Sequence, residues 1–404
     1  MSPSAYSIAI LGAGPVGCAL ALLLARGAAD PSRIVLLHDG AAPALPASGA
    51  STAVAPARTT GAVTVAPRAD ARSVAVNYGS RVLLQNLHAW PARAADIRTI
   101  HVSQRGRLGR TLIRHTDFNV PQLGSVAAYS DLHAALWAGV QASGVTLLHA
   151  AGARVEVPDG EAATLRTPDG PLRCAVAVRC DGAGGGELRR EYGQHAVLAT
   201  VKATRPLDAW AFERFTREGP LALLPHPAGA DTYALVWCCT PERAAALLAL
   251  DDASFAAALN EVYGERMGPL HCLSARHVFP LFLSARRAVV QGRTVAIGNA
   301  AQTLHPVAGQ GLNLGLRDAA RLAQELAPWL FDPDEAPHAR LERYARARRD
   351  DRWVTLTLTD LMPRVFATGL AGIEHAAGAA LLGLDLIAPL RAPLARQLLQ
   401  GLRS

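Results

Sequence analysis

Residues 298–313 form a loop in which one proline and two closely spaced glycines precede the start of a helix. The loop follows the apolar run 294–297, which is typical of a strand. Glycines let the backbone approach a planar group closely, and a helix start directs unpaired N–H groups and partial positive charge at it. A ring that becomes anionic on reduction would be stabilised there. The residues expected to contact such a ring are Gly298, Asn299, Pro306, Gly309, Gly311, Leu312 and Asn313.

A second glycine-rich turn lies near the N-terminus, between the apolar runs 7–11 and 33–37, with a helix-like stretch after it. This order predicts a strand–helix–strand unit that binds a dinucleotide. In such a unit Gly12 makes the tight turn, Gly14 admits a pyrophosphate to the backbone, and Gly17 lets the helix pack on the strand. The phosphates would then lie at the N-terminus of the helix.

Acidic residues follow two of the predicted strands. Asp39 stands about where dinucleotide sites place the acid that holds a ribose hydroxyl, roughly twenty residues after the glycines. His38 is its neighbour, and the sequence leaves open which of the two faces the ribose. Asp181 and Gly182 follow the apolar strand 172–179. They could form a third segment that contacts the nucleotide. They could equally form an ordinary turn, because Asp-Gly favours turns anywhere.

In this order, the three segments resemble the FAD-binding motifs of the single-component aromatic hydroxylases, the class A flavin monooxygenases. The family commonly has Asp and His where this chain has Asn299 and Gln302. The loop sequence with Asn299 and Gln302 is similar to that of the family's ubiquinone-biosynthesis branch. The resemblance implies an α/β fold, in which a Rossmann-like FAD-binding domain carries an inserted β-sheet substrate domain and a helical C-terminus.

The resemblance extends over most of the chain. It implies that Asp181 lies beside the FAD pyrophosphate and Arg72 near its phosphates, although Arg72 could instead be one of many surface arginines. The segments 100–106 and 212–225 are similar to stretches of the ubiquinone hydroxylases. In the latter segment the candidate substrate contacts are Phe212 and Phe215.

The reaction implied by the resemblance is hydroxylation of a polyprenylated methoxyphenol by O₂ through a flavin C4a-hydroperoxide, with NAD(P)H or another donor as reductant. The candidate catalytic residues are His305 and Gln310, and a histidine that only braces the loop is an equal alternative for His305. A sister hydroxylase acting on another ring position or a different aromatic substrate remains open. So do a flavin-dependent lipid dehydrogenase or reductase and a non-catalytic subunit of a biosynthetic assembly.

The composition of the chain argues against some classes of binding partner. The chain has 404 residues, 50% of them hydrophobic, and a net charge of +7 without a basic block, which argues against nucleic-acid binding. The six cysteines show no metal-ligand spacing and are interpreted as small buried hydrophobic residues, so no metal site is predicted.

Without a signal peptide or an apolar run that could cross a bilayer, the protein is expected in the cytoplasm, either free or peripheral on the inner membrane with other ubiquinone-biosynthesis proteins.

The predicted domains are discontinuous. Beyond residue 340 we expect helices broken by Pro363, Pro389 and Pro393. The run 383–402 sets leucines against Arg391 and Arg396, so it could pack on the FAD domain or rest on a membrane or partner. The predicted ranges are 1–85, 105–186 and 286–340 for the FAD-binding domain, 86–104 and 187–285 for the substrate domain, and 341–404 for the C-terminal helical region.

Overall fold

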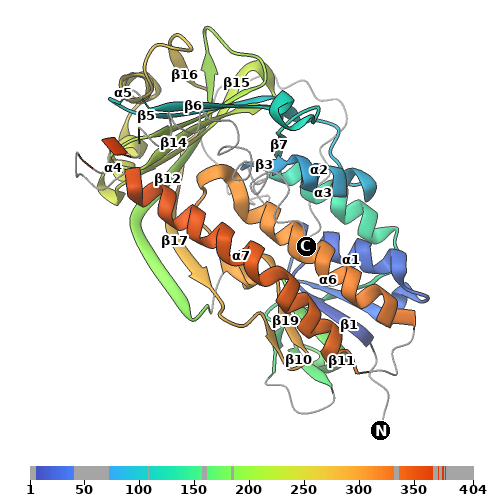
Figure 1. Ribbon diagram of the computed structural model, residues 1–404. Helices are drawn as coiled ribbons and strands as arrows, with labels where there is room; N and C mark the ends of the chain where they lie inside the picture. Colours follow the sequence, from blue (N-terminus) through green and yellow to red (C-terminus); the bar gives the residue numbers. More distant parts are fainter. Residues whose placement is uncertain are drawn as a thin grey trace, which may run out of the picture.

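The protein is known here from a computed structural model. It describes residues 6–40, 72–107, 109–156, 162–182, 186–331 and 336–366, together with 372, 375, 376 and 378. Two sheets lie next to each other, and long helices pack along one of them (Figure 1). The α/β fold predicted from the sequence is confirmed.

The first sheet carries the N-terminal strands at its centre, in the order β18-β19-β11-β1-β2-β8. Strands β19, β11, β1, β2 and β8 run parallel to one another, as the strand–helix–strand prediction requires. The strands are β1 (Tyr6–Leu11), β2 (Ile34–His38), β8 (Thr146–His149), β9 (Arg154–Val155), β10 (Ala163–Thr167), β11 (Gly170–Arg179), β18 (Val290–Gln291) and β19 (Thr294–Ala296).

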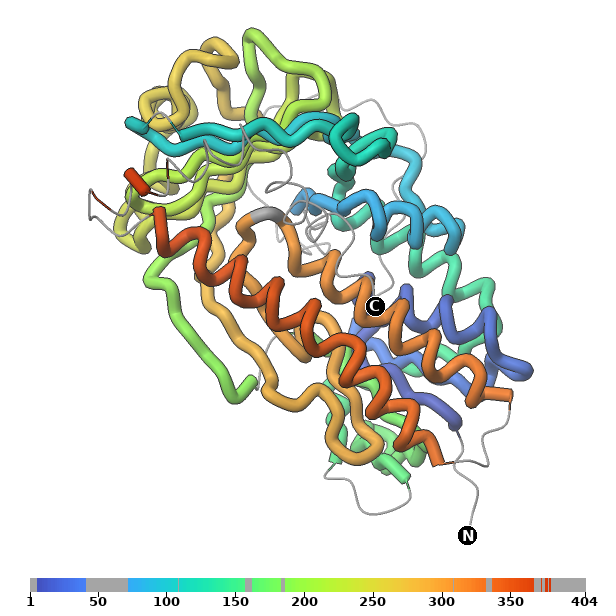
Figure 2. The backbone as a smooth tube through the Cα atoms, in the orientation of Figure 1, coloured from blue at the N-terminus to red at the C-terminus, as the bar shows by residue number. Residues whose placement is uncertain are grey.

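Alternation along β1 shows how this sheet is buried on both faces. Ile8 and Ile10 enter the core shared with the helices, while Ala9 and Leu11 enter a smaller cluster that β10 helps to cover. The helices on the first face are α1 (Pro15–Gly27), α3 (Tyr129–Gln141), α6 (Gln310–Phe331) and α7 (His338–Phe366). Figure 2 shows α7 running along α6, and an added Cβ on Gly27 of α1 would lie 2.7 Å from Cβ of Ala327 in α6.

The second sheet is mostly antiparallel, in the order β20-β17-β12-β15-β14-β13-β5-β6, with β16 pairing β12. Strands β13 and β5 are parallel. Helices α4 (Pro241–Ala249) and α5 (Asp252–Tyr263) cover one face, where Trp237, Phe255 and Leu259 are buried. The strands are β5 (Thr99–Gln104), β6 (Arg110–Arg114), β12 (Leu188–Ala203), β13 (Trp210–Phe215), β14 (Pro220–His226), β15 (Gly229–Cys239), β16 (Leu270–Cys272), β17 (His277–Ala285) and β20 (Gln302–Thr303).

A small third sheet, β3-β7-β4, lies beside the helix α2 (Tyr78–Asn86). Its strands are β3 (Ser73–Asn77), β4 (Ala95–Ile97) and β7 (Gly124–Ala128). Short 3-10 turns complete the elements at Pro31–Arg33, His115–Phe118, Gly298–Ala300 and Val307–Gly309.

Strand pairing differs from the predicted boundaries in three places. We assigned β6 and β20 to the FAD-binding part, but both pair with strands of the second sheet. We assigned β4 to the substrate domain, but it pairs with β7, which lies in a range assigned to the FAD-binding domain. Local alternation identifies a strand without saying which sheet it joins, because pairing is set by distant segments. The division into domains otherwise remains a prediction.

The predicted break at Pro363 is wrong. Pro363 is buried inside α7, which continues to Phe366. A proline in a helix interior loses one hydrogen bond and crowds the preceding turn, and packing of this buried residue offsets that cost. The run 383–402 and the breaks at Pro389 and Pro393 lie outside the described residues. Within the described part of the chain, no helix is long and apolar enough to cross a membrane.

Candidate FAD and substrate site

A cavity of about 950 Å³ lies between the first sheet, the second sheet and the N-terminus of α6. Segments far apart in sequence meet around it. The predicted cofactor contacts that line it are Gly12, Gly14, Asp39, Arg72, Asp181, Asn299, Pro306, Gly309, Gly311, Leu312 and Asn313. Gly17 and Gly298 are not among its lining residues.

At the nucleotide end, the three glycines of the N-terminal turn have different environments. A Cβ added to Gly12 or Gly17 would meet backbone atoms at 2.7 Å and 2.0 Å, so the turn itself requires both glycines. At Gly14 the nearest atom would be Tyr129 Oη at 3.8 Å. Gly14 is also the N-cap of α1, and no side chain caps that helix. Open space and unpaired N–H groups therefore coincide at this point, which suits a pyrophosphate.

His38 and Asp39 both line the cavity, but their side chains differ in what they contact. His38 Nδ1 lies 2.9 Å from the Gly40 carbonyl, and its ring packs edge-on against Trp137 and His149. Asp39 is exposed and has no side-chain partner among the described residues. Asp39 is therefore the side chain available to a ribose hydroxyl.

Arg72 and Asp181 both line the cavity. The Arg72 guanidinium sits 4.7 Å from the centre of the Tyr129 ring, a cation–π contact that orients it. Asp181 accepts two hydrogen bonds from Arg179, at 3.2 and 2.9 Å, which offset its negative charge beside a phosphate site.

In the loop 298–311, Gly309 and Gly311 have different environments. Gly309 has φ +59°, a conformation that other residues rarely adopt. Gly311 lies in the first turn of α6, and an added Cβ there would meet nothing within 4 Å. The side chain of Asn299 is exposed at the cavity. The loop thus leaves open space in front of a helix N-terminus, an arrangement that suits a planar ring carrying negative charge.

A buried network that the sequence did not reveal supports this loop. Asp318 of α6 accepts hydrogen bonds from the Gly298 N–H (3.3 Å), from Gln302 Nε2 (2.8 Å) and from Arg348 Nε of α7 (2.8 Å). Gln302 in turn accepts from Arg352 Nε at 2.6 Å. The glutamine that departs from the common family motif therefore joins the loop to two helices. Charged residues on long helices usually indicate a solvated face, so the sequence carried no signal for this network.

Asn313 was predicted to contact the cofactor, and its side chain instead binds protein backbone. Its Oδ1 accepts from the Asn77 N–H at 2.9 Å, and its Nδ2 donates to the carbonyls of Ala75 (3.0 Å) and Gly309 (2.7 Å). The side chain holds β3 against the loop.

His305 lies behind the loop and is fully buried, away from the cavity lining. Its Nδ1 accepts from the Val307 N–H at 3.2 Å, so Nε2 carries the hydrogen and donates to Gln194 Oε1 at 3.2 Å. Burial lowers the pKa of His305 to about 4, with a smaller opposing effect of Asp360. This geometry fits the bracing alternative and not the catalytic one. Gln310, the other catalytic candidate, is buried and lines the cavity.

The wall formed by the second sheet is apolar. Neither predicted aromatic contact presents its ring there: Phe215 stacks on Phe366 of α7 with ring centroids 4.1 Å apart. Phe212 borders the cavity, but its ring packs on the opposite face of the sheet against Tyr263. Alternation along β13 turns Phe212 away from the cavity. The apolar residues that line the wall include Ile100, Val102, Ile113, Ala196, Leu198, Ala211, Ala222, Leu224, Val236 and Leu281.

Glu213 is the residue of this wall that sequence reasoning passed over. It lies between the two predicted phenylalanines and lines the cavity. Period-two alternation puts it on the same face of β13 as Ala211, and the structure shows that this face meets the cavity.

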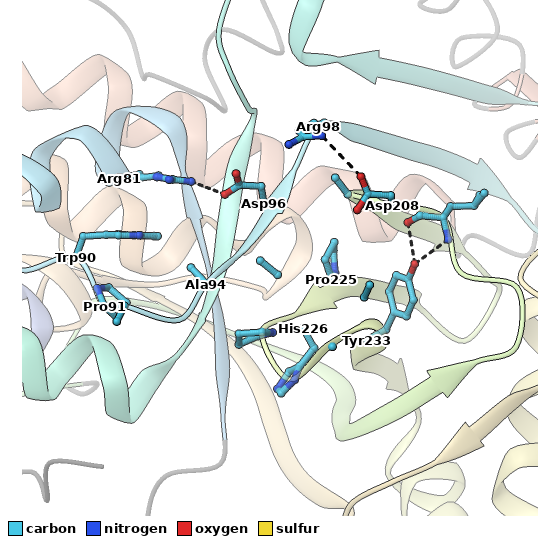
Figure 3. A pocket seen from close by; sticks show the side chains of 17 residues that line it. Arg81, Trp90, Pro91, Ala94, Asp96, Arg98, Asp208, Pro225, His226 and Tyr233 are labelled. Atoms are coloured by element: carbon cyan, nitrogen blue, oxygen red, sulfur yellow. Dashed lines mark hydrogen bonds and ion pairs between the residues drawn. The ribbon is translucent and has the colours of Figure 1, made fainter. Parts of the chain in front are cut away.

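A second pocket of about 710 Å³ lies where the segment 90–98 meets the turn between β14 and β15 (Figure 3). Its charged side chains pair with one another: Arg81 with Asp96, and Arg98 with Asp208 at 3.7 Å. The Tyr233 hydroxyl donates to the Leu207 carbonyl at 2.9 Å. This pairing leaves little to recognise a charged ligand.

The fold and the cavity define a flavoprotein of the aromatic hydroxylase architecture. The solved p-nitrophenol 4-monooxygenase PnpA from Pseudomonas putida superposes with a TM-score of 0.71 over 99% of this chain and 100% of that one, at 15% identity. PqsL of Pseudomonas aeruginosa, described as a probable FAD-dependent monooxygenase, gives 0.67 over 94% and 99%, at 18% identity. At these identities the likeness shows the fold alone.

A family model described as FAD binding domain matches residues 83–359. The chain therefore belongs to this FAD-binding family, and its cofactor is FAD. Ubiquinone hydroxylase UbiL of Rhodospirillum rubrum is 35% identical over 58% of this chain and 56% of that protein. The 3-demethoxyubiquinol 3-hydroxylase of Escherichia coli is 28% identical over 92% of both. The chain spans about half the length of the first two curated relatives that it matches.

Proposed function

We propose that this protein is an FAD-dependent monooxygenase that hydroxylates a polyprenylated methoxyphenol in ubiquinone biosynthesis. The observation that carries the proposal is the continuity of the cavity. One space joins the glycine turn at α1, the loop before α6 and the apolar wall of the second sheet. A flavin held by the first two would face an aromatic ring held against the third.

The nucleotide would be held by groups that the cavity already presents. In this proposal the N-terminus of α1 and Arg72 bind the phosphates, Asp39 binds the ribose, and Asn299 binds the ribityl chain. The N–H groups at the start of α6 stabilise negative charge on the ring. Bound FAD, reduced by NAD(P)H or another donor, supplies the activation of O₂ at its C4a carbon.

The apolar wall supplies what such a reaction needs from the protein. Side chains such as Val102, Leu198 and Val236 exclude water and offer a surface to a prenylated ring. Relatives named for ubiquinone hydroxylation support this substrate class. A sister activity at another ring position is the second candidate, because the relative that matches 92% of the chain is named as a 3-hydroxylase of demethoxyubiquinol.

A deletion strain tests the proposal. It should lose ubiquinone and accumulate the unhydroxylated phenol, and the wild-type gene should restore ubiquinone. Gly311→Val should not restore it, because the added side chain enters open cavity space in front of α6. Ala245→Val, on the exposed side of α4, is the matched control and should restore it fully.

The identity of the accumulated phenol distinguishes the two ring positions. Purified protein supplied with ¹⁸O₂ should place one labelled oxygen in the product, whereas a dehydrogenase or reductase would place none. Unchanged ubiquinone in the deletion strain, in the absence of a second hydroxylase, would refute the proposed function.

A further inference from the structure

Glu213 differs from the other charged residues that line the cavity. Asp39, Arg72 and Asp181 lie at the nucleotide end, among polar groups and backbone N–H donors. Glu213 lies on β13, in the wall formed by the second sheet. It is thus the charged side chain that a substrate ring would meet, within the part of the cavity that the structure describes.

Strand register places Glu213 in the middle of an apolar row. It is opposite Ala222 of β14 on one side and Val102 of β5 on the other. The row continues through Val236 of β15 to Leu198 of β12, and all of these residues line the cavity. Neighbouring side chains on one face of a sheet lie about 5 Å apart, so apolar groups surround the carboxyl on both sides.

No described residue pairs with this carboxyl. It takes part in no hydrogen bond or ion pair with the rest of the described chain, and burial raises its pKa to about 7. A carboxylate without a partner in an apolar wall lowers stability. Such a group is typical of sites where the partner is a ligand.

Few other titratable groups face this position. Cys238 of β15 lines the same wall, and burial, together with the charge of Glu213, raises the pKa of its thiol. Thr303, Leu304, Val307 and Gln310 from the loop side and Met362 from α7 do not ionise in the accessible pH range. Glu213 is therefore the group of this wall that can exchange a proton near neutral pH.

We propose that Glu213 accepts a hydrogen bond from the hydroxyl of the phenol substrate and takes its proton as the ring is hydroxylated. This inference rests on the proposed function. The O–H bond breaks, the proton joins a carboxylate oxygen, and the electron pair stays on the substrate oxygen, which raises electron density at the ring carbons ortho and para to it. The attacked ring carbon later loses its own hydrogen as a proton to solvent. The carboxyl then returns its proton to the substrate oxygen, and Glu213 is again ionised.

The ionisation of Glu213 suits this role. A base whose pKa lies near the working pH is ionised often enough to accept a proton and basic enough to draw it. Because the ionised form accepts the hydrogen bond, the preference for a phenol should appear as the pH rises through about 7.

Ligand binding to the oxidised, FAD-loaded protein tests the proposal without turnover. The probes are a singly prenylated 2-methoxyphenol and its O-methyl ether, which lacks the hydroxyl, with binding measured by titration calorimetry at pH 6 and pH 8. Wild type should prefer the phenol by about tenfold or more at pH 8, as expected for a hydrogen bond to a charged group. The preference should weaken at pH 6.

Glu213→Gln should reduce this preference and remove its pH dependence, and Glu213→Leu should abolish it while leaving affinity for the ether unchanged. Glu265→Gln, at an exposed position, is the control and should behave as wild type. FAD content shows that each variant is folded. A preference for the phenol that is the same in wild type and both Glu213 variants overturns the assignment. If the wild-type gene nevertheless restores ubiquinone in the deletion strain, the unchanged phenol preference refutes the role of Glu213 and leaves the proposed function standing.

Discussion

Gly14→Val tests whether glycine at this position is required for FAD binding or for folding of the protein. The backbone at Gly14 is extended (φ −68°, ψ 177°), which any residue can adopt. An added Cβ would touch nothing closer than 3.8 Å. A valine there should enter the space proposed for the pyrophosphate, without displacing protein atoms. Gly17→Ala is the contrast, because its Cβ would lie 2.0 Å from the Gly12 carbonyl oxygen.

The two variants should therefore differ in kind. Gly14→Val should change the unfolding free energy of the apoprotein by about 1 kcal/mol or less, the scale of an N-cap substitution. It should weaken FAD by at least about 1.5–3 kcal/mol, the value of one lost hydrogen bond to a charged group, which is roughly ten- to hundredfold. Gly17→Ala should cost the apoprotein about 1–3 kcal/mol or more, because backbone has to move.

Urea unfolding of the apoproteins, followed by circular dichroism, measures the first quantity. Titration with FAD, followed by quenching of flavin fluorescence, measures the second. Wild-type FAD affinity in Gly14→Val would show that the pyrophosphate does not approach α1 at this residue. A loss of apoprotein stability as large as that of Gly17→Ala would show that Gly14 serves the fold instead.

Three further outcomes are expected. Asn299→Asp should retain FAD, whereas Asn299→Leu should weaken it by about 1–3 kcal/mol if a polar group of the cofactor loses its partner; equal affinities in fluorescence titration would show no contact. Asp318→Asn should lower the unfolding free energy by about 1.5–3 kcal/mol in urea, because buried Arg348 would lose one of its two carboxylate partners and keep Asp351, while Asp350→Asn at an exposed position of α7 should change it little. Because the folded protein keeps His305 neutral down to about pH 4, whereas the unfolded chain protonates it below about pH 6.5, wild type should lose stability as the pH falls through this window. His305→Gln should lose less across the same range, and parallel pH–stability curves for the two proteins would contradict this.

Local sequence predicted the features that local sterics control. The turn at Gly12 and the loop with Gly309 need backbone conformations that glycine adopts most readily, and both carry positive φ. Alternating and continuous apolar runs predicted β1, β2 and β11 because side-chain direction repeats every two residues along a strand. These signals are contained within a few neighbouring residues, so the architecture and the nucleotide end of the cavity could be predicted without coordinates.

Tertiary structure alone decided which polar side chains face the cavity and which hold the protein together. Asn313 and His305 stand in the right segment, yet one binds the backbone of β3 and the other donates to Gln194. Asp318 accepts from the loop at Gly298 and Gln302 and from Arg348 of α7, which meet only in the folded chain. Glu213 looks like an ordinary strand residue until β5 and β14 surround it with apolar neighbours. Burial and hydrogen-bond partners depend on contacts between distant residues, and no short stretch of sequence specifies them.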